Sequence, residues 1–180
     1  MCSSDLLAPS PTEVAAGRAI IRVLLVPASD HTDSAIPPPE LALSDRARGE
    51  VMTYLNERRL ITTTLQIDPP EYRFVSVEVT AGARKRALRD PLRAEIERAL
   101  YRLINPVHGG PDGEGWPWER NLFQSEVTAL VQGIEGVEYV ETVRLYVVDM
   151  ITNTRTPVEG TITCPANGLL ASYNHVVTVK

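Results

Sequence analysis

The segment from His108 to Arg120, HGGPDGEGWPWER, combines residue types that often bind ligands or do chemistry in a loop. Its four glycines suggest a phosphate cradle, because glycine lets backbone N–H groups approach an anion closely. A P-loop, however, has Gly-Lys followed by Ser or Thr at the start of a helix, and this segment contains none of Lys, Ser and Thr. The dinucleotide-binding pattern follows a strand, whereas this segment follows a predicted helix. The spacing therefore does not favour phosphate binding.

Acidic side chains in the same segment could bind a divalent cation. Asp112, Glu114 and Glu119 supply carboxylates, but their spacing departs from that of an EF-hand loop. The three histidines of the chain show no HExxH, HxxxH or HxH spacing, and the two cysteines form no CxxC pair. We therefore predict no catalytic residue, no cofactor and no metal site. The alternative is a metal-dependent or hydrolytic enzyme that uses His108, Asp112 and Glu114.

Two tryptophans flank Pro117, which restricts the backbone between them. Large aromatic side chains either fill a core or act as anchors in a protein interface. We take Trp116, Trp118 and Arg120 as candidate contacts with a partner protein. Burial of both tryptophans in their own domain is one alternative, and an aromatic platform for sugar in a glycan-binding tail module is another.

A basic cluster, Arg84, Lys85, Arg86 and Arg89, precedes a predicted helix. Runs of charge usually face water, so a solvated loop is the simplest interpretation. In an acidic chain the cluster could also be a selective docking surface for an acidic neighbour. These four residues complete the candidate partner contacts.

Charge and hydropathy exclude several classes of function. The 180 residues are 43% hydrophobic and 23% charged, which is usual for a globular protein. With a formal net charge of -5 and a pI near 5.3, the chain lacks the basic face expected of a nucleic-acid-binding protein. Its apolar runs are shorter than the roughly 20 residues that cross a bilayer, and no secretory signal begins the sequence. We predict neither nucleic-acid binding nor membrane insertion.

Hydrophobic periodicity indicates the elements that would position these residues. Runs rich in β-branched residues or with alternating polarity predict strands at 19–26, 62–67, 72–79 and 137–148. Apolar residues spaced by three and four predict helices at 40–58, 91–104 and around 127–134. In the strand at 72–79, the face that carries Val75, Val77 and Val79 should cover the core.

The ends of the elements carry further signals. Asp90 is predicted to cap the second helix, with Pro91 in its first position. Two weaker strands, 160–164 and 171–179, are predicted to form a hairpin around the turn at 165–168.

Together the elements predict an α+β fold: a mixed, largely antiparallel sheet with three helices packed on it, plus a C-terminal β hairpin. We expect a disordered lead-in at residues 1–17, an α/β region at 18–150 and a β tail at 151–180. The α/β region could divide into two subdomains, 18–60 and 61–150.

Several segments, in a fixed order, match a known family. They are LNERRL at 55–60, PEYRFVSV at 70–77, INPVHGG at 104–110, GWPWER at 115–120, SEV at 125–127 and GVEYV at 136–140. Together they resemble the C-terminal part of baseplate J-like assembly proteins of contractile phage tails and related contractile injection systems. The resemblance spans roughly residues 19–148.

The resemblance implies a structural wedge subunit that joins neighbouring wedges around the tail hub and helps to transmit the trigger for sheath contraction. Members of the family are much longer, so it implies that this chain is a C-terminal portion. It implies no catalytic residues and no obligatory cofactor. The implied partners are other baseplate wedge proteins and further copies of itself, assembled in the cytoplasm into a phage tail or phage-tail-like injection particle.

Overall fold

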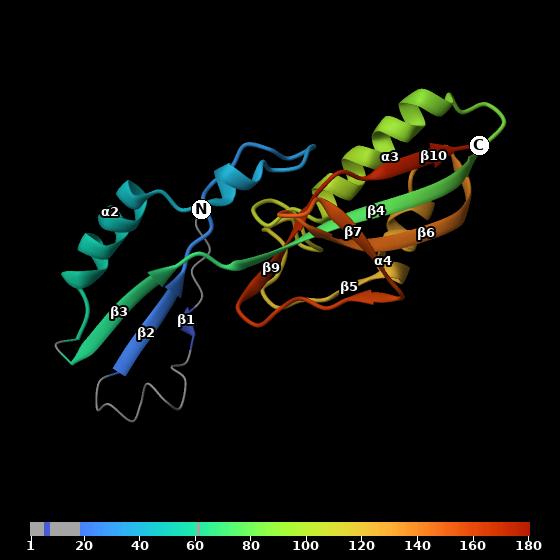
Figure 1. Ribbon diagram of the computed structural model, residues 1–180. Helices are drawn as coiled ribbons and strands as arrows, with labels where there is room; N and C mark the ends of the chain where they lie inside the picture. Colours follow the sequence, from blue (N-terminus) through green and yellow to red (C-terminus); the bar gives the residue numbers. More distant parts are fainter. Residues whose placement is uncertain (1–5, 8–18, 61) are drawn as a thin grey trace. The chain divides into compact units, whose positions relative to one another are not determined.

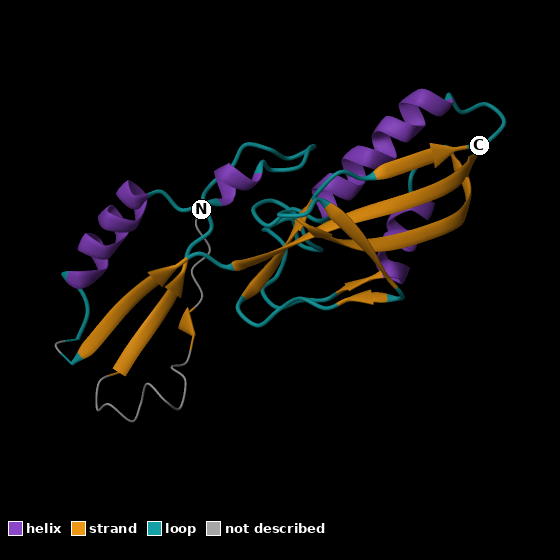
Figure 2. Cartoon of the chain, viewed as in Figure 1, coloured by secondary structure: helices purple, strands orange, loops and turns teal. Residues whose placement is uncertain are grey.

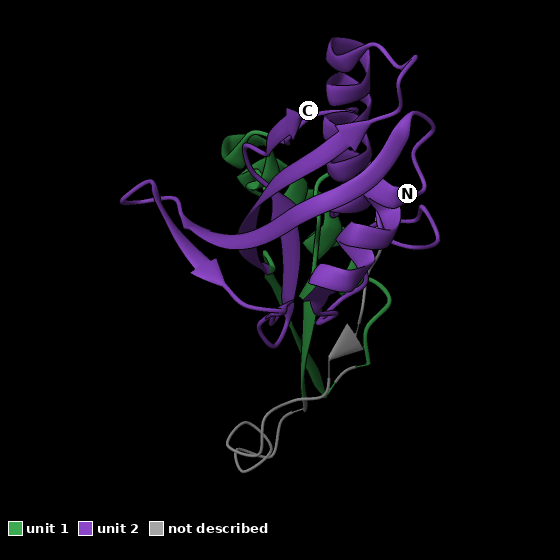
Figure 3. Cartoon of the chain, turned by 90° about the vertical axis from the view of Figure 1, so that its right-hand side faces the viewer, with its two compact units in different colours: residues 1–29, 37–70 green, residues 30–36, 71–180 purple. Residues whose placement is uncertain are grey.

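The structure is a computed structural model that describes residues 6–7, 19–60 and 62–180 (Figure 1). The chain divides into two compact units, residues 1–29 with 37–70 and residues 30–36 with 71–180 (Figure 3). The predicted lead-in at residues 1–17 lies outside the described residues except for Leu6 and Leu7.

The first unit contains a sheet of three strands. In this sheet β2 (Ala19–Leu24) pairs antiparallel with β1 (Leu6–Leu7) and parallel with β3 (Thr63–Asp68). The six paired positions of β2 and β3 run in register from Ala19 opposite Thr63 to Leu24 opposite Asp68. The strands predicted at 19–26 and 62–67 are therefore confirmed.

Among the described residues of this unit there is one α-helix. A short 3-10 turn, η1 (Pro38–Leu41), precedes α2 (Asp45–Asn56). The helix begins after Ser44 because the Ser44 hydroxyl accepts a hydrogen bond from the Ala47 amide at 3.2 Å. The apolar residues of α2 pack on a small core formed by Val23, Leu25 and Ile67.

The second unit is built around one long central strand, β4 (Glu71–Ala83). Along one edge, β4 pairs antiparallel with β6 (Val137–Asp149), and β6 pairs antiparallel with β7 (Thr154–Val158). The other edge of β4 pairs parallel with β9 (Gly168–Ser172) and then with β10 (Val176–Val179). A separate pair joins β5 (Leu122–Phe123) to β8 (Thr161–Ile162).

Two helices, α3 (Arg89–Leu103) and α4 (Gln124–Gln132), cover one face of this sheet (Figure 2). Val75, Val77 and Val79 point to that face and are completely buried, as their alternation predicts. They share one core with the apolar residues of the two helices, Leu92, Ile96, Leu100, Val127 and Val131. Trp116 belongs to this core and Ala87 packs against it, so the core positions the two segments that contain the candidate contact residues.

The predicted α+β class is confirmed, with three α-helices among the described residues and mixed, mostly antiparallel sheets. A hairpin near the C-terminus is also present, formed by β6 and β7. The partners of the tail strands differ from the prediction: β8 pairs with β5, and β9 and β10 pair with β4. The turn at 165–168 therefore joins two strands that do not pair with each other.

The predicted cap of α3 is wrong. The Leu88 carbonyl accepts the Leu92 amide at 3.1 Å, so the first turn closes at Leu88 and Asp90 lies inside it. Leu88 occupies the N-cap position and supplies no capping side chain. Pro91 remains in the first turn, where a backbone N–H has no partner within the helix.

Candidate interaction site

A single buried asparagine organises the loop from residue 105 to residue 120. Asn105 is 2% exposed, and its amide nitrogen donates to the His31 carbonyl at 2.7 Å. Its side-chain oxygen accepts the amides of Val107 and His108, at 2.8 and 3.0 Å. Its backbone carbonyl accepts the Trp116 amide at 2.8 Å. Asn105 was not among the residues predicted from the sequence to matter, although an Asn-Pro pair after a helix is typical of a turn.

Three of the four glycines of the loop, Gly109, Gly110 and Gly115, pack closely against backbone atoms. A Cβ at Gly109 would lie 2.5 Å from the Arg102 carbonyl oxygen, and one at Gly115 would lie 2.7 Å from the Pro106 carbonyl oxygen. Gly115 also has a φ of 108°, which side chains rarely adopt. These glycines therefore allow two segments of the chain's own backbone to approach each other, whereas a phosphate cradle would use them to approach an anion.

Trp116 lies in the core of the second unit and is 2% exposed. Its indole nitrogen donates to the Arg120 carbonyl at 2.9 Å, and the Arg120 guanidinium lies 4.8 Å from the centre of the indole ring. Arg120 also pairs with Glu126. Trp116 is therefore a core residue whose side chain is not available to a partner at the surface, whereas Trp118 is half-buried.

A hollow of about 780 Å³ lies beside this loop. His108 and Asp112 line it, but Glu114 does not. Its wall includes Asp33 and Arg102, joined by two hydrogen bonds of 2.6 and 3.0 Å, and this contact lowers the pKa of Asp33. Within residues 6–7, 19–60 and 62–180, no three His, Cys, Asp or Glu side chains gather closely enough to hold a metal ion.

His175 is buried and hydrogen-bonded within the sheet of the second unit. Its Nδ1 accepts the Val77 amide at 3.0 Å, in the gap between β9 and β10, and its Nε2 lies 3.1 Å from the Ser172 hydroxyl. That hydroxyl donates to the Ile104 carbonyl at 2.8 Å. Burial lowers the pKa of His175 to about 3. The ring is therefore neutral at physiological pH and completes the sheet's hydrogen bonding.

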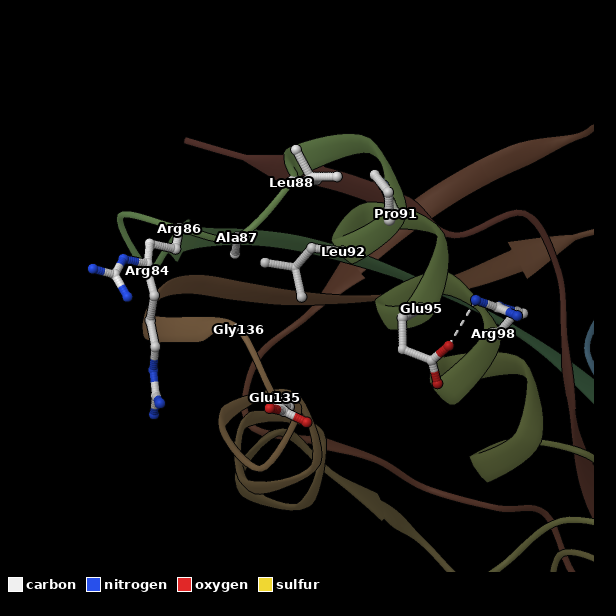
Figure 4. A pocket seen from close by; sticks show the side chains of 10 residues that line it. All are labelled: Arg84, Arg86, Ala87, Leu88, Pro91, Leu92, Glu95, Arg98, Glu135 and Gly136. Atoms are coloured by element: carbon white, nitrogen blue, oxygen red, sulfur yellow. Dashed lines mark ion pairs between the residues drawn. The ribbon is translucent and has the colours of Figure 1, made fainter.

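A second hollow, of about 600 Å³, lies at the basic cluster (Figure 4). Arg84 and Arg86 lie on one side of it, and Glu95 and Arg98 lie on the opposite side. Arg84 is held by two contacts of its own, from its amide to the Gly136 carbonyl at 2.9 Å and from its Nε to the Val137 carbonyl at 3.2 Å.

An apolar floor and rim complete this hollow, which we call the basic hollow. Ala87 and Leu92 lie between its two sides, and Leu88 and Pro91 line it as well. Leu88 is 74% exposed although it is a large apolar residue. The cations were predictable from the sequence but Leu88 was not, because an exposed leucine at the start of a helix looks in sequence like any other apolar residue of that helix.

The structure therefore brings the candidate residues into two groups. Arg84 and Arg86 line the basic hollow, with Lys85 and Arg89 exposed in the same segment. Trp116 and Arg120 form a stacked pair within the loop before β5. Among the residues that the structure describes, no helix is long and apolar enough to cross a membrane.

No protein-family model matches the sequence, and no curated protein matches it. Among solved structures, a chain of the cryo-EM structure of the anti-feeding prophage (AFP) baseplate, 6-fold symmetrised, is similar, with a TM-score of 0.55 and 12% sequence identity. The similarity covers 94% of this chain and 33% of that chain. This chain thus spans about a third of the length of the baseplate chain, and its fold is similar to that third.

Proposed function

We propose that this chain is a structural component of the baseplate of a contractile injection system or phage tail. The observation that carries the proposal is the fold similarity to a baseplate chain over 94% of the sequence. An interrupted or partial match would leave room for an unrelated domain, but this match includes both compact units. The ordered resemblance of six segments to baseplate J-like proteins points to the same kind of particle.

The more specific role that we propose is that of a J-like wedge subunit. It would join neighbouring wedges around the tail hub and help to transmit the trigger for sheath contraction, with other wedge proteins and copies of itself as partners. It would be assembled in the cytoplasm and work as part of the particle. The order of the segments at residues 55–60, 70–77, 104–110, 115–120, 125–127 and 136–140 supports this role.

The local geometry is compatible with a structural role. Three of the four glycines that suggested a phosphate cradle, Gly109, Gly110 and Gly115, pack against the chain's own backbone. The buried His175 is engaged in hydrogen bonds within the sheet. The Arg120 and Trp116 side chains stabilise the loop between α3 and β5. The residues that we propose as surface contacts are Trp118 and the basic cluster of Arg84, Lys85, Arg86 and Arg89.

Particle assembly tests the proposal. The natural protein that contains this chain would be deleted from a strain that makes the particles and supplied again with an epitope tag. Immunoelectron microscopy of purified particles should label the baseplate end, and the deletion should leave particles without complete baseplates. Complete baseplates in the deletion strain, or label elsewhere on the particle, would contradict the proposal.

A surface variant tests the proposed contact. Trp118→Ala should reduce incorporation of the tagged protein while its circular dichroism stays unchanged, because the side chain is only half-buried in the isolated chain. Arg48→Glu, an exposed change on α2, serves as the control variant and should be incorporated normally.

A further inference from the structure

The basic cluster is positively charged, although the chain as a whole is negatively charged. Residues 84–93, RKRALRDPLR, carry five cations and one acid, in a chain with a formal net charge of -5. A concentration of like charge raises the free energy of a folded domain, and like charges at positions i and i+4 of a helix, as at Arg89 and Arg93, are destabilising.

Three of these cations, Lys85, Arg86 and Arg89, have no partner among the described residues. Elsewhere in the second unit, four arginines pair with acidic side chains: Arg98 with Glu95, Arg102 with Asp33, Arg120 with Glu126 and Arg144 with Glu78. By contrast, the side chains of Lys85, Arg86 and Arg89 have no ion-pair or hydrogen-bond partner within residues 6–7, 19–60 and 62–180. All three are exposed. The fold therefore presents a group of cations that an outside anion can neutralise.

An apolar surface lies directly beside these cations. Leu92 forms part of the floor of the basic hollow, and Leu88 projects at its rim with 74% of its surface exposed (Figure 4). Gly136 keeps the hollow open, because a Cβ at this position would lie 3.3 Å from the Ala87 side chain. Its φ of 97° also disfavours any residue with a side chain.

The surface is held in shape before any partner binds. The Arg84 amide donates to the Gly136 carbonyl at 2.9 Å, the Ala87 amide donates to the Arg84 carbonyl at 2.8 Å, and Leu88 closes the first turn of α3. These bonds join the end of β4, the start of α3 and the turn before β6. Because this surface is already ordered, the chain itself gives up less conformational entropy when a partner binds.

We propose that the basic hollow binds an acidic segment of a partner protein. The carboxylates of that segment pair with Arg86 and its neighbours Lys85 and Arg89, while one apolar side chain packs between Leu88 and Leu92. This inference rests on the charges and the hollow, and it does not depend on the proposed baseplate role.

The carboxylates at the hollow favour a peptide over nucleic acid or an anionic membrane. Glu95 and Glu135 line the hollow opposite or below the cations (Figure 4). A continuous row of phosphates or lipid headgroups would be repelled by Glu135, because the charge of Glu95 is already paired with Arg98. A peptide avoids this repulsion, because it can place its acidic residues at Arg86 and an apolar residue over Leu92.

A labelled peptide tests the proposal in solution. The probe is a seven-residue peptide of Glu and Asp with one central Leu, and its binding to the full chain is followed by fluorescence anisotropy. Binding should weaken as salt is raised, because the contact is largely exposed. Arg86→Glu should weaken it by about ten-fold, whereas the matched charge reversal Arg48→Glu on α2 should change it by less than about two-fold.

The apolar part of the contact needs its own comparison. Leu88→Ala should weaken binding of the leucine peptide but not of the same peptide with Ala in the central position. Circular dichroism of each variant separates loss of binding from loss of folding. A folded Arg86→Glu variant that binds as tightly as the wild type overturns the proposal.

Competing ligands decide the class of partner. The proposal is overturned if double-stranded DNA, or vesicles that contain phosphatidylserine, bind more tightly than the peptide and share its dependence on Arg86. Failure of peptide binding leaves the immunoelectron microscopy result untouched, and failure to find the protein in baseplates leaves peptide binding untouched, so the two proposals can fail separately.

Discussion

His175 shows how burial determines what a histidine can do. An exposed imidazole titrates near neutral pH, but the His175 ring is 8% exposed and packs 4.6 Å from the Tyr101 ring, measured between centroids. Burial first, and the Arg155 charge second, lower its pKa from 6.5 to about 3. The neutral ring accepts the Val77 amide through Nδ1, a bond that an imidazolium could not make.

Stability should therefore decrease as the pH falls through the slightly acidic range. Unfolded His175 gains a proton below pH 6.5, whereas folded His175 stays neutral down to about pH 3, so protonation favours the unfolded chain throughout this window. At pH 5 the difference amounts to about 2 kcal/mol of unfolding free energy relative to pH 7. Urea unfolding at the two pH values measures it.

Two variants test whether His175 causes this loss of stability at low pH. In His175→Ala, the loss between pH 7 and pH 5 should shrink by about 2 kcal/mol, although the variant is less stable at pH 7 because the Val77 amide loses its acceptor. Leu170→Ala, which removes a buried apolar side chain and no titratable group, should lower the stability equally at both pH values and so keep the wild-type pH dependence. If both variants lose as much stability between pH 7 and pH 5 as the wild type, His175 is not the group that causes the loss.

The two tryptophans should differ in their effect on stability. Trp116→Ala removes a core side chain and should lower the free energy of unfolding by about 3–5 kcal/mol. Trp118→Ala removes a half-buried one and should cost about 1 kcal/mol. Chemical denaturation compares them, and equal losses would contradict the burial difference.

At the scale of elements, the pairing of β4 with β6 depends on one glycine. Gly82 lies opposite Tyr139 in the register, next to an irregularity between Gly82 and Ala83. A Cβ at Gly82 would lie 2.3 Å from a ring carbon of Tyr139, so the ring lies against the glycine. Glycine in a strand often marks such a close approach.

A double-mutant cycle tests this contact. Gly82→Ala should cost about 1 kcal/mol in the wild type, because Tyr139, which is 48% exposed, must move off the strand. In the Tyr139→Ala background the same change should cost nothing, which gives a coupling energy of about 1 kcal/mol from urea denaturation. Equal costs in both backgrounds would show that the backbone at residue 82 needs glycine for another reason.

At the scale of the whole molecule, each compact unit has its own core. Val23, Leu25 and Ile67 form that of the first unit, and Val77 lies in that of the second. Differential scanning calorimetry should therefore resolve two transitions. Ile67→Ala should lower only one of them and Val77→Ala only the other, because each removes about 2–4 kcal/mol of core packing. A single transition that both variants lower would show that the units unfold together.

Much of the secondary structure was predictable because it depends on local pattern. The alternation of Val75, Val77 and Val79 predicted a strand and its buried face, and both are observed. The stripe of Leu92, Ile96 and Leu100 predicted α3. Side chains two apart in a strand, or three to four apart in a helix, share a face whatever surrounds the element. The candidate cations were also recognisable, because charge is a property of the residue itself.

Other features were decided only by tertiary structure. The partners of β8, β9 and β10 depend on which edges the rest of the chain leaves open, and parallel pairing with β4 leaves no local sign in the tail. Trp116 and Trp118 are the same residue type and flank the same proline, so the sequence does not distinguish them. Only Trp116 is buried in the core.

The basic cluster shows the same division. That Arg84, Lys85, Arg86 and Arg89 are close together and positively charged follows from the order of the residues alone. The basic hollow beside them depends on tertiary structure. Its walls come from α3 and from the turn before β6, two segments distant in sequence that a shared core holds together.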